Sequence, residues 1–196
     1  MPEPVQTFAI QGPLLLAPRV FGDARGFFFE SWNQRQWHQL LADHGQEPVA
    51  LVQDNHSRSR RGVLRGLHYQ RPPSPQGKLV RCVAGEIFDV AVDLRRSSPT
   101  FGQWLGVRLS AENHQQLWVP VGFAHGFLTV SEHAEVLYKT TDFWSQPCER
   151  ALRWDDPDLS ISWPKECLLD GQPLLAEKDA KAPALEQALA AGDLFS

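Results

Sequence analysis

Residues 78–93 read Lys-Leu-Val-Arg-Cys-Val-Ala-Gly-Glu-Ile-Phe-Asp-Val-Ala-Val-Asp, and this stretch decides the fold class. It contains two short runs rich in β-branched or alternating residues, 78–84 and 86–93, with one glycine between them. This pattern is typical of neighbouring strands joined by a tight turn. Asp89 interrupts the second run, and its side chain needs a hydrogen-bond partner or water if it faces inward.

Similar runs, bounded by Gly, Pro, Ser or Asn, occur on both sides of this stretch. The predicted strands outside it are residues 14–16, 26–32, 49–54, 62–69, 102–109, 116–119, 126–130 and 134–141. Many short strands at regular spacing indicate an all-β sandwich or barrel. Helices are predicted only at 37–44, which is followed by Gly45, and at 180–191, which is rich in Ala, Leu, Glu and Gln.

The chain has 196 residues, with no internal repeat and no linker long enough to separate two domains. We therefore expect a single domain over residues 1–196. The strand-rich core is expected at about residues 45–165, and a helical tail at about residues 180–196.

The formal net charge is −4, and basic residues cluster only at Arg58–Arg61. This balance argues against nucleic-acid binding, and the cluster is interpreted as a solvated loop. The N-terminus lacks a basic segment followed by an apolar run, and the apolar run 14–16 is too short to span a membrane. A cytoplasmic location without a membrane partner is therefore expected.

Three cysteines, Cys82, Cys148 and Cys167, are an odd number and show no Cys-x-x-Cys spacing. They predict a reduced, intracellular protein with no disulfide framework.

Four side chains are candidates for chemistry. His68 lies in a predicted strand, and His125 is followed by a glycine at a turn into a strand. Lys78 begins a strand after a proline-rich loop, and Tyr138 is one of only two tyrosines. An imidazole or a phenol transfers protons, and an ammonium group stabilises a phosphate or a developing oxyanion. Taken singly, each also has a structural interpretation, as a core, turn or surface residue.

Strand alternation makes a prediction about the residues around His68. On a regular strand, Arg65, Leu67 and Tyr69 share one face, whereas Gly66, His68 and Gln70 share the other. An inward-facing His68 needs a partner for at least one ring nitrogen.

A metal site is not expected from this pattern. Metal-binding sandwiches of the cupin type usually present a His-x-His pair, but the corresponding residues here are His68-Tyr69-Gln70, so the second ligand is missing.

In their order along the chain, these motifs resemble the dTDP-4-dehydrorhamnose 3,5-epimerase family from about residue 5 to residue 185. The matching segments are 23–28, 53–57, 65–70, 76–78, 89–95, 120–127, 138–141, 154–157 and 161–164. The resemblance implies an all-β, cupin-like jelly-roll β-sandwich with short peripheral helices. It also implies a homodimer with no metal and no organic cofactor.

The reaction implied by the resemblance inverts C3 and C5 of a dTDP-linked 4-keto-6-deoxyglucose and gives the 4-keto precursor of dTDP-L-rhamnose. By resemblance, His68 is the base, Asp179 is its carboxylate partner, and Tyr138 is the acid on the opposite face of the sugar. Lys78 would stabilise the enolate oxygen.

The substrate-binding residues implied by the resemblance fall into three groups. Arg65 and His125 contact sugar and phosphate, and Arg25 and Glu30 reach the base across a dimer interface. Further binding positions are Gln53, Asn55, Glu149 and Lys178.

The chain departs from the family pattern at Trp144, six residues after Tyr138, where the family often has an aromatic hydroxyl. The hydroxyl is absent, whereas an aromatic surface is retained. A related epimerase that inverts only C3 or only C5 therefore stays open. So do a non-catalytic sandwich that binds nucleotide sugars and a metal-dependent cupin.

Overall fold

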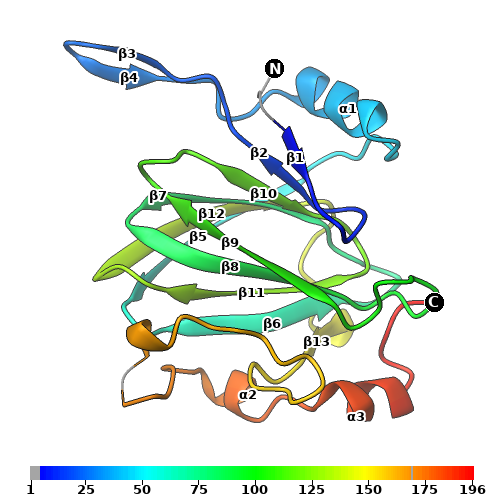
Figure 1. Ribbon diagram of the computed structural model, residues 1–196. Helices are drawn as coiled ribbons and strands as arrows, with labels where there is room; N and C mark the ends of the chain where they lie inside the picture. The colour runs from blue at the N-terminus through cyan, green and yellow to red at the C-terminus, as the bar shows by residue number, and fades with distance from the viewer. Residues whose placement is uncertain (1–4, 169) are drawn as a thin grey trace.

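The computed structural model describes residues 5–168 and 170–196, and these form two antiparallel sheets packed face to face (Figure 1). The predicted all-β sandwich is confirmed. The six-stranded sheet contains, in spatial order, β1 (Val5–Thr7), β2 (Leu14–Leu16), β10 (Gln116–Val119), β7 (Lys78–Ala84), β12 (His133–Thr140) and β5 (Gln53–Arg60). The five-stranded sheet contains β13 (Glu149–Ala151), β6 (Leu64–Gln70), β11 (Phe123–Thr129), β8 (Glu86–Asp93) and β9 (Trp104–Ser110).

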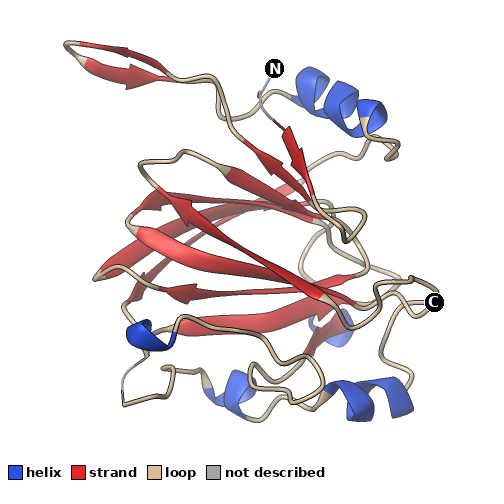
Figure 2. Cartoon of the chain, viewed as in Figure 1, coloured by secondary structure: helices blue, strands red, loops and turns tan. Residues whose placement is uncertain are grey.

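Helices are few and peripheral (Figure 2). They are α1 (Gln34–Asp43), α2 (Glu177–Ala180) and α3 (Leu185–Ala190), with short 3₁₀ turns at Gln146–Cys148 and Lys165–Cys167. A separate hairpin, β3 (Phe21–Asp23) and β4 (Gly26–Phe28), extends away from the sandwich and is called the arm below (Figure 1).

The space between the sheets is filled by alternate residues of facing strands. Val80 and Val136 of the six-stranded sheet pack with Ile87, Ala91 and Phe127 of the five-stranded sheet. Burial of such apolar surface is the main driving force of folding. Polar side chains that face inward, such as Asp89 and His125, are therefore exceptions within this apolar layer.

Each sheet is also covered on its outer face. α1 packs Trp37, Leu40 and Leu41 against the six-stranded sheet. Behind the five-stranded sheet, residues of the C-terminal third, including Leu152 and Trp163, cover the outer side of β6 and β8. In Figure 1, α2 and α3 accordingly lie beneath β6.

Several predicted boundaries are wrong for identifiable reasons. The helix expected at 37–44 begins at Gln34, because Asn33 caps it by accepting hydrogen bonds from the backbone N–H groups of Arg35 and Gln36. The C-terminal helix expected from residue 180 begins at Leu185, because Pro183 disfavours a helical conformation at Ala182 and lacks an N–H donor.

Strand positions differ from the prediction near β5 and the N-terminus. The strand expected at 49–54 runs instead from Gln53 to Arg60, so Arg58 and Arg60 belong to an edge strand rather than to a loop. Both arginines are exposed. Charged side chains on an edge strand disfavour its pairing with a strand of another molecule. The strand expected at 26–32 ends at Phe28. β1 and β2 join the six-stranded sheet, so the sandwich extends beyond the expected core of about 45–165.

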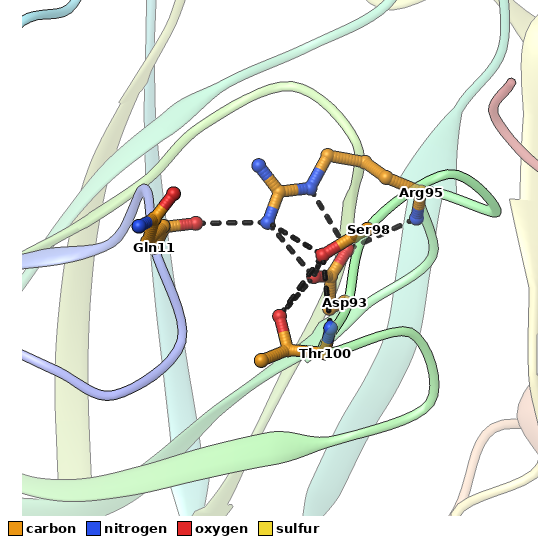
Figure 3. Close-up of polar contacts among 5 residues, drawn as sticks. All are labelled: Gln11, Asp93, Arg95, Ser98 and Thr100. Atoms are coloured by element: carbon orange, nitrogen blue, oxygen red, sulfur yellow. Dashed lines mark hydrogen bonds and ion pairs between the residues drawn. The ribbon is translucent and has the colours of Figure 1, made fainter.

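A buried carboxylate anchors one end of the sandwich (Figure 3). Asp93, at the end of β8, accepts hydrogen bonds from Arg95, Ser98 and Thr100. Burial opposes its ionisation, but these hydrogen bonds outweigh burial and hold its pKa below the ordinary value. Arg95 also donates to the carbonyl oxygen of Gln11 over 2.8 Å, which ties the N-terminal segment to the β8–β9 connection.

β6 is irregular where regular alternation was expected. His68 pairs with His125 of β11, but Arg65 pairs with Phe127, so Gly66 and Leu67 oppose only one residue. This bulge reverses the alternation. The predicted grouping of Arg65 with Leu67 and Tyr69 is therefore wrong: Arg65 donates to Ser59 of the opposite sheet, whereas Leu67 and Tyr69 pack in the outer core.

Gly66 permits this bulge. Its φ is +121°, and a Cβ there would lie 2.6 Å from the Cα of Gly126. Only a residue without a side chain allows the two strands to approach so closely.

We predict that Gly66→Ala lowers the free energy of unfolding by about 1–3 kcal/mol more than Gly26→Ala, measured by urea denaturation. Both glycines have a strongly positive φ, which strains any substituent at either position, but nothing lies within 4 Å of a Cβ at Gly26. Equal losses of stability in the two variants would show that the close approach of β6 and β11 is not restrictive.

Candidate active site

The central feature of the site is a short hydrogen bond between a strand and a helix from the end of the chain. His68 Nε2 lies 2.6 Å from Asp179 Oδ1, and the other oxygen of Asp179 accepts from the backbone N–H of Gly66 over 3.4 Å. Asp179 is on α2 and is only 2% exposed. The predicted pairing of His68 with Asp179 therefore has the geometry of a histidine–carboxylate dyad.

The surroundings of this pair set its charge state. Burial lowers the pKa of His68, and the hydrogen bond and charge of Asp179 only partly offset this effect. Burial also opposes ionisation of Asp179, but the interactions with His68 and Gly66 hold the carboxyl pKa below its usual range. Near neutral pH the site therefore contains an ionised carboxylate and a neutral imidazole.

Lys78 begins β7 and is buried, with Nζ 3.2 Å from the carbonyl oxygen of His68. Burial lowers the pKa of its ammonium group to about 8, although the charges of Asp89 and Glu149 favour the protonated form. An ammonium with this pKa is mostly charged at neutral pH, and it is poorly hydrated. Such a group stabilises a nearby oxyanion far better than a solvated lysine does.

Tyr138 is on β12, in the sheet opposite His68. Burial raises the pKa of its phenol, which keeps the O–H protonated and able to donate. Tyr138, His68 and Lys78 line one cavity of about 110 Å³. The remaining lining residues are Gln53, Asn55, Tyr69, Gln70, Gln76, Trp144 and Glu149.

A second ion pair lies beside this cavity. Lys178, next to Asp179 in sequence, donates to Glu149 Oε1 over 2.8 Å. Burial opposes ionisation of Glu149, but Lys178 holds its pKa below the ordinary value. The pair joins α2 to β13, and it places both predicted binding residues at the same end of β6.

Two predicted binding residues face the space between the sheets. Arg65, at the exposed rim of this space, donates to Ser59 Oγ over 2.9 Å. His125 is buried, and its Nε2 lies 2.8 Å from Asp89 Oδ1. Asp89 is completely buried, and His125 is the partner that an inward-facing Asp89 was expected to need. His125 lies within β11, so the turn position suggested by its sequence neighbours is wrong.

The last two predicted binding residues lie elsewhere. Arg25 is at the tip of the arm, pairs with Asp23 and has a side chain that is 90% exposed. Glu30 lines a separate hollow of about 380 Å³ between the arm, α1 and the outer face of the six-stranded sheet. The single chain therefore does not bring Arg25 or Glu30 to the cavity that contains His68.

Sequence reasoning missed Gln70 and Gln76 as cavity residues. Gln70 shares the expected face of His68, two positions away, so alternation could have identified it. Gln76 comes from a loop, where no periodicity operates, and only the fold brings it to the cavity.

Within the described ranges 5–168 and 170–196, no group of three or more His, Cys, Asp or Glu side chains is arranged to hold a metal ion. In the same ranges, no helix is long and apolar enough to cross a membrane.

The fold and cavity together define a class: a cupin-like β-sandwich whose interior carries a histidine–carboxylate dyad, a phenol and a buried ammonium group suited to proton transfer. Comparison with known proteins then gives the family. The family model described as dTDP-4-dehydrorhamnose 3,5-epimerase matches residues 7–187, and the chain belongs to this family of isomerases.

Curated relatives are similar over nearly their whole length. The dTDP-4-dehydrorhamnose 3,5-epimerase of Pseudomonas aeruginosa is 61% identical over 180 residues, covering 92% of this chain and 94% of the relative. That of Salmonella typhimurium is 57% identical over 181 residues, with the same coverage of both chains.

Solved structures share the fold. The Legionella pneumophila enzyme in complex with dTDP-4-keto-L-rhamnose has a TM-score of 0.89 and 46% identity, covering 98% of this chain and 97% of that one. A 3′-monoepimerase from Streptomyces bikiniensis in complex with dTDP-quinovose has a TM-score of 0.87 and 33% identity, covering 96% and 91%. The predicted cupin-like jelly-roll class is confirmed.

We predict that Asp179→Asn lowers the pKa of His68 further, because the carboxylate is the group that favours its protonated form. The pKa is measured by NMR titration of the imidazole in both proteins. A pKa that stays the same or rises in Asp179→Asn would contradict this electrostatic account of the dyad.

Proposed function

We propose that this protein is a dTDP-4-dehydrorhamnose 3,5-epimerase that converts dTDP-4-dehydro-6-deoxy-D-glucose to dTDP-4-dehydro-L-rhamnose. The observation that carries this proposal is that His68 and Tyr138 line one cavity from opposite sheets. Inversion at carbon needs a base on one side of the sugar ring and an acid on the other, and this arrangement supplies both.

His68 is the proposed base. An ionised carboxylate can only accept hydrogen bonds, so the imidazole nitrogen facing Asp179, Nε2, carries the hydrogen. Nδ1 is then the basic nitrogen, and it takes a proton from the carbon next to the 4-keto group. Asp179 stabilises the imidazolium that forms. A positioned base of this kind contributes about 10²–10⁴ in rate.

Lys78 is the proposed stabiliser of the enolate. When a C–H bond beside the ketone breaks, the electron pair moves toward O4, which becomes negatively charged. A poorly hydrated ammonium group directed at that oxygen favours the enolate more than the ketone. One such contact is worth roughly 10²–10³ in rate.

Tyr138 is the proposed acid. Its phenol delivers a proton to the enolate carbon from the face opposite His68, so that the C=C bond reverts to the ketone with inverted configuration. This step leaves a phenolate and an imidazolium. The raised pKa of Tyr138 makes the phenolate a strong base, which regains a proton from solvent before the second inversion. The imidazolium of His68 releases its proton to solvent in the same interval, so the base is neutral again.

Of the proposed binding groups, Gln53, Asn55 and Glu149 line the cavity that contains His68. Arg65 and His125 would contact sugar and phosphate, and an arginine fork matches phosphate oxygens well. Gln53, Asn55, Glu149 and Lys178 would contact the nucleotide sugar at the cavity mouth. Trp144 is exposed there and supplies a flat surface for the base or sugar.

The second candidate function inverts only one of the two carbons. Two observations favour it. Trp144 lacks the hydroxyl that the family often has at this position, and the similar structure from Streptomyces bikiniensis is that of a 3′-monoepimerase. The same experiment distinguishes the two candidates.

We predict that incubation with dTDP-4-keto-6-deoxyglucose in D₂O labels both C3 and C5, as located by NMR. Label at one carbon supports the mono-epimerase. Binding of the substrate without label supports a non-catalytic protein.

The variant His68→Ala should fold normally, and its rate of C3 exchange should fall by a factor of about 10²–10⁴, because no other group replaces the base.

Tyr138→Phe serves as the matched variant in that experiment. It removes the acid and leaves the base, so C5 inversion, which needs both groups, should fall more than C3 exchange, which needs only the base. Equal losses of C5 inversion and C3 exchange would contradict the division of roles between His68 and Tyr138.

The proposal includes a homodimer. The arm exposes large apolar side chains, with Phe27 64% and Phe28 69% exposed. Exposed aromatic clusters of this kind are typical of interaction surfaces. Arg25 and Glu30 lie on or beside the arm, and they would complete the nucleotide site of the partner protomer.

We predict that the double variant Phe27→Ser, Phe28→Ser converts a dimer to a monomer in sedimentation experiments, because the apolar contact of the arm is lost. The KM for the nucleotide sugar should rise in parallel. A wild-type protein that sediments as a monomer at micromolar concentration would contradict the dimer.

Residues 1–196 are proposed to form one epimerase domain, because the N-terminal strands join the main sheet and the C-terminal helices cover β6. A cytoplasmic location is proposed because the three cysteines are free and buried.

A further inference from the structure

Gln70 is the last residue of β6, and its buried side chain makes three hydrogen bonds to backbone groups of two loops. Its Nε2 donates to the carbonyl oxygens of Ser74, over 2.6 Å, and Phe143, over 3.2 Å. Its Oε1 accepts from the backbone N–H of Ser145 over 2.8 Å. Two donors and one acceptor in this geometry require an amide, because neither a carboxylate nor an apolar group provides both.

The second of these loops carries the exposed aromatic residues Phe143 and Trp144. Gln70 binds the residue on each side of Trp144, and the N–H of Trp144 itself donates to Gln53 Oε1 over 3.0 Å. Two buried or half-buried amides therefore hold three consecutive backbone groups. The indole of Trp144 makes none of these three hydrogen bonds; it interacts with Glu149, and its backbone, held by Gln70 and Gln53, sets where the ring starts from.

Gln70 also connects this loop to both proposed catalytic segments. It is two residues after His68 on the same strand, and Ser74 belongs to the loop that leads to Lys78. A shift of Gln70 would move Trp144 relative to His68 and leave the His68–Asp179 dyad intact. The dyad is held independently by α2 and by Gly66.

We propose that Gln70 is a positioning residue that sets the distance between Trp144 and the catalytic cavity, and thereby controls the affinity for the nucleotide part of the substrate. This inference rests on the proposed function for its ligand, a thymidine diphosphate sugar. Gln70 acts through Trp144 and takes no part in proton transfer.

The test uses Gln70→Met, which keeps the length of the side chain and removes all three hydrogen bonds. Aromatic stacking on a base contributes about 5- to 150-fold in affinity, so misplacing Trp144 should raise the KM for the nucleotide sugar about tenfold. Because the dyad is untouched and Lys78 keeps its own hydrogen bond to the carbonyl oxygen of His68, kcat should stay within threefold. The dissociation constant of dTDP, measured by calorimetry, should rise by the same factor as KM.

A double-mutant cycle separates positioning from general stability. If Gln70 acts through Trp144, then Gln70→Met changes the dissociation constant of dTDP less than twofold in a Trp144→Ala background. Additive effects of the two substitutions overturn the proposal. A kcat that falls as much as kcat/KM, with KM unchanged, overturns it as well.

Gln46→Met is the matched control. Gln46 also makes two hydrogen bonds, to the indole of Trp118 and to the carbonyl oxygen of Gly12, but it lies outside the cavity. Replacing Gln46 should lower Tm and leave dTDP binding unchanged.

If Gln70→Met is too unstable to assay, Gln70→Glu is used. A glutamate keeps the shape of the side chain and the acceptor for the N–H of Ser145, but its second oxygen repels the carbonyl oxygens of Ser74 and Phe143.

Calorimetry with dTDP needs no turnover, so it tests the role of Gln70 even if the epimerase activity is absent. Loss of the proposed function therefore appears as a lack of label in D₂O, whereas failure of this inference appears as unchanged or additive dTDP affinities.

Discussion

The hydrogen bond between His68 and Asp179 is the interaction on which the site depends, because it joins residues 111 positions apart in the sequence. Asp179 is on a four-residue helix that is too short to be stable alone, so its position comes from packing and hydrogen bonds. The ion pair of Lys178 with Glu149 and the bond from Gly66 hold this helix against β6. The chemistry of the imidazole thus depends on the C-terminal segment covering the outer side of the sheet.

Burial affects the three reactive groups in different ways, and each effect is useful. It keeps His68 neutral and therefore basic, and it keeps Tyr138 protonated. It also lowers the pKa of Lys78 to about 8, which leaves a charged but poorly hydrated ammonium group near neutral pH. Burial in a single cavity between the two sheets therefore shifts the pKa values of all three groups in the directions that the proposed base, acid and electrostatic stabiliser need.

The bulge in β6 explains how one strand serves two purposes. Regular alternation would place Arg65 on the side opposite His68, within the apolar outer core. The extra residue at Gly66–Leu67 turns Arg65 toward the opposite sheet while Leu67 and Tyr69 stay in the outer core. The local rule was broken where two backbones approach closely, and glycine at positions 66 and 126 allows that approach. The pattern of side chains alone gives no sign of it.

The sequence by itself determined the all-β class and the bounds of strands such as β7, β8 and β10. These follow from local periodicity and turn residues. His68, Lys78 and Tyr138 became the proposed reactive side chains through the resemblance of their motifs to one family. Only the tertiary structure decided the turn of Arg65 toward the opposite sheet, the pairing of His125 with Asp89 and the contacts of Gln70. It also left Arg25 and Glu30 outside the cavity. The reason is physical: local patterns report the preferences of neighbouring residues, whereas a site is built from contacts between strands and loops far apart in the chain, and the packing of the two sheets sets these contacts.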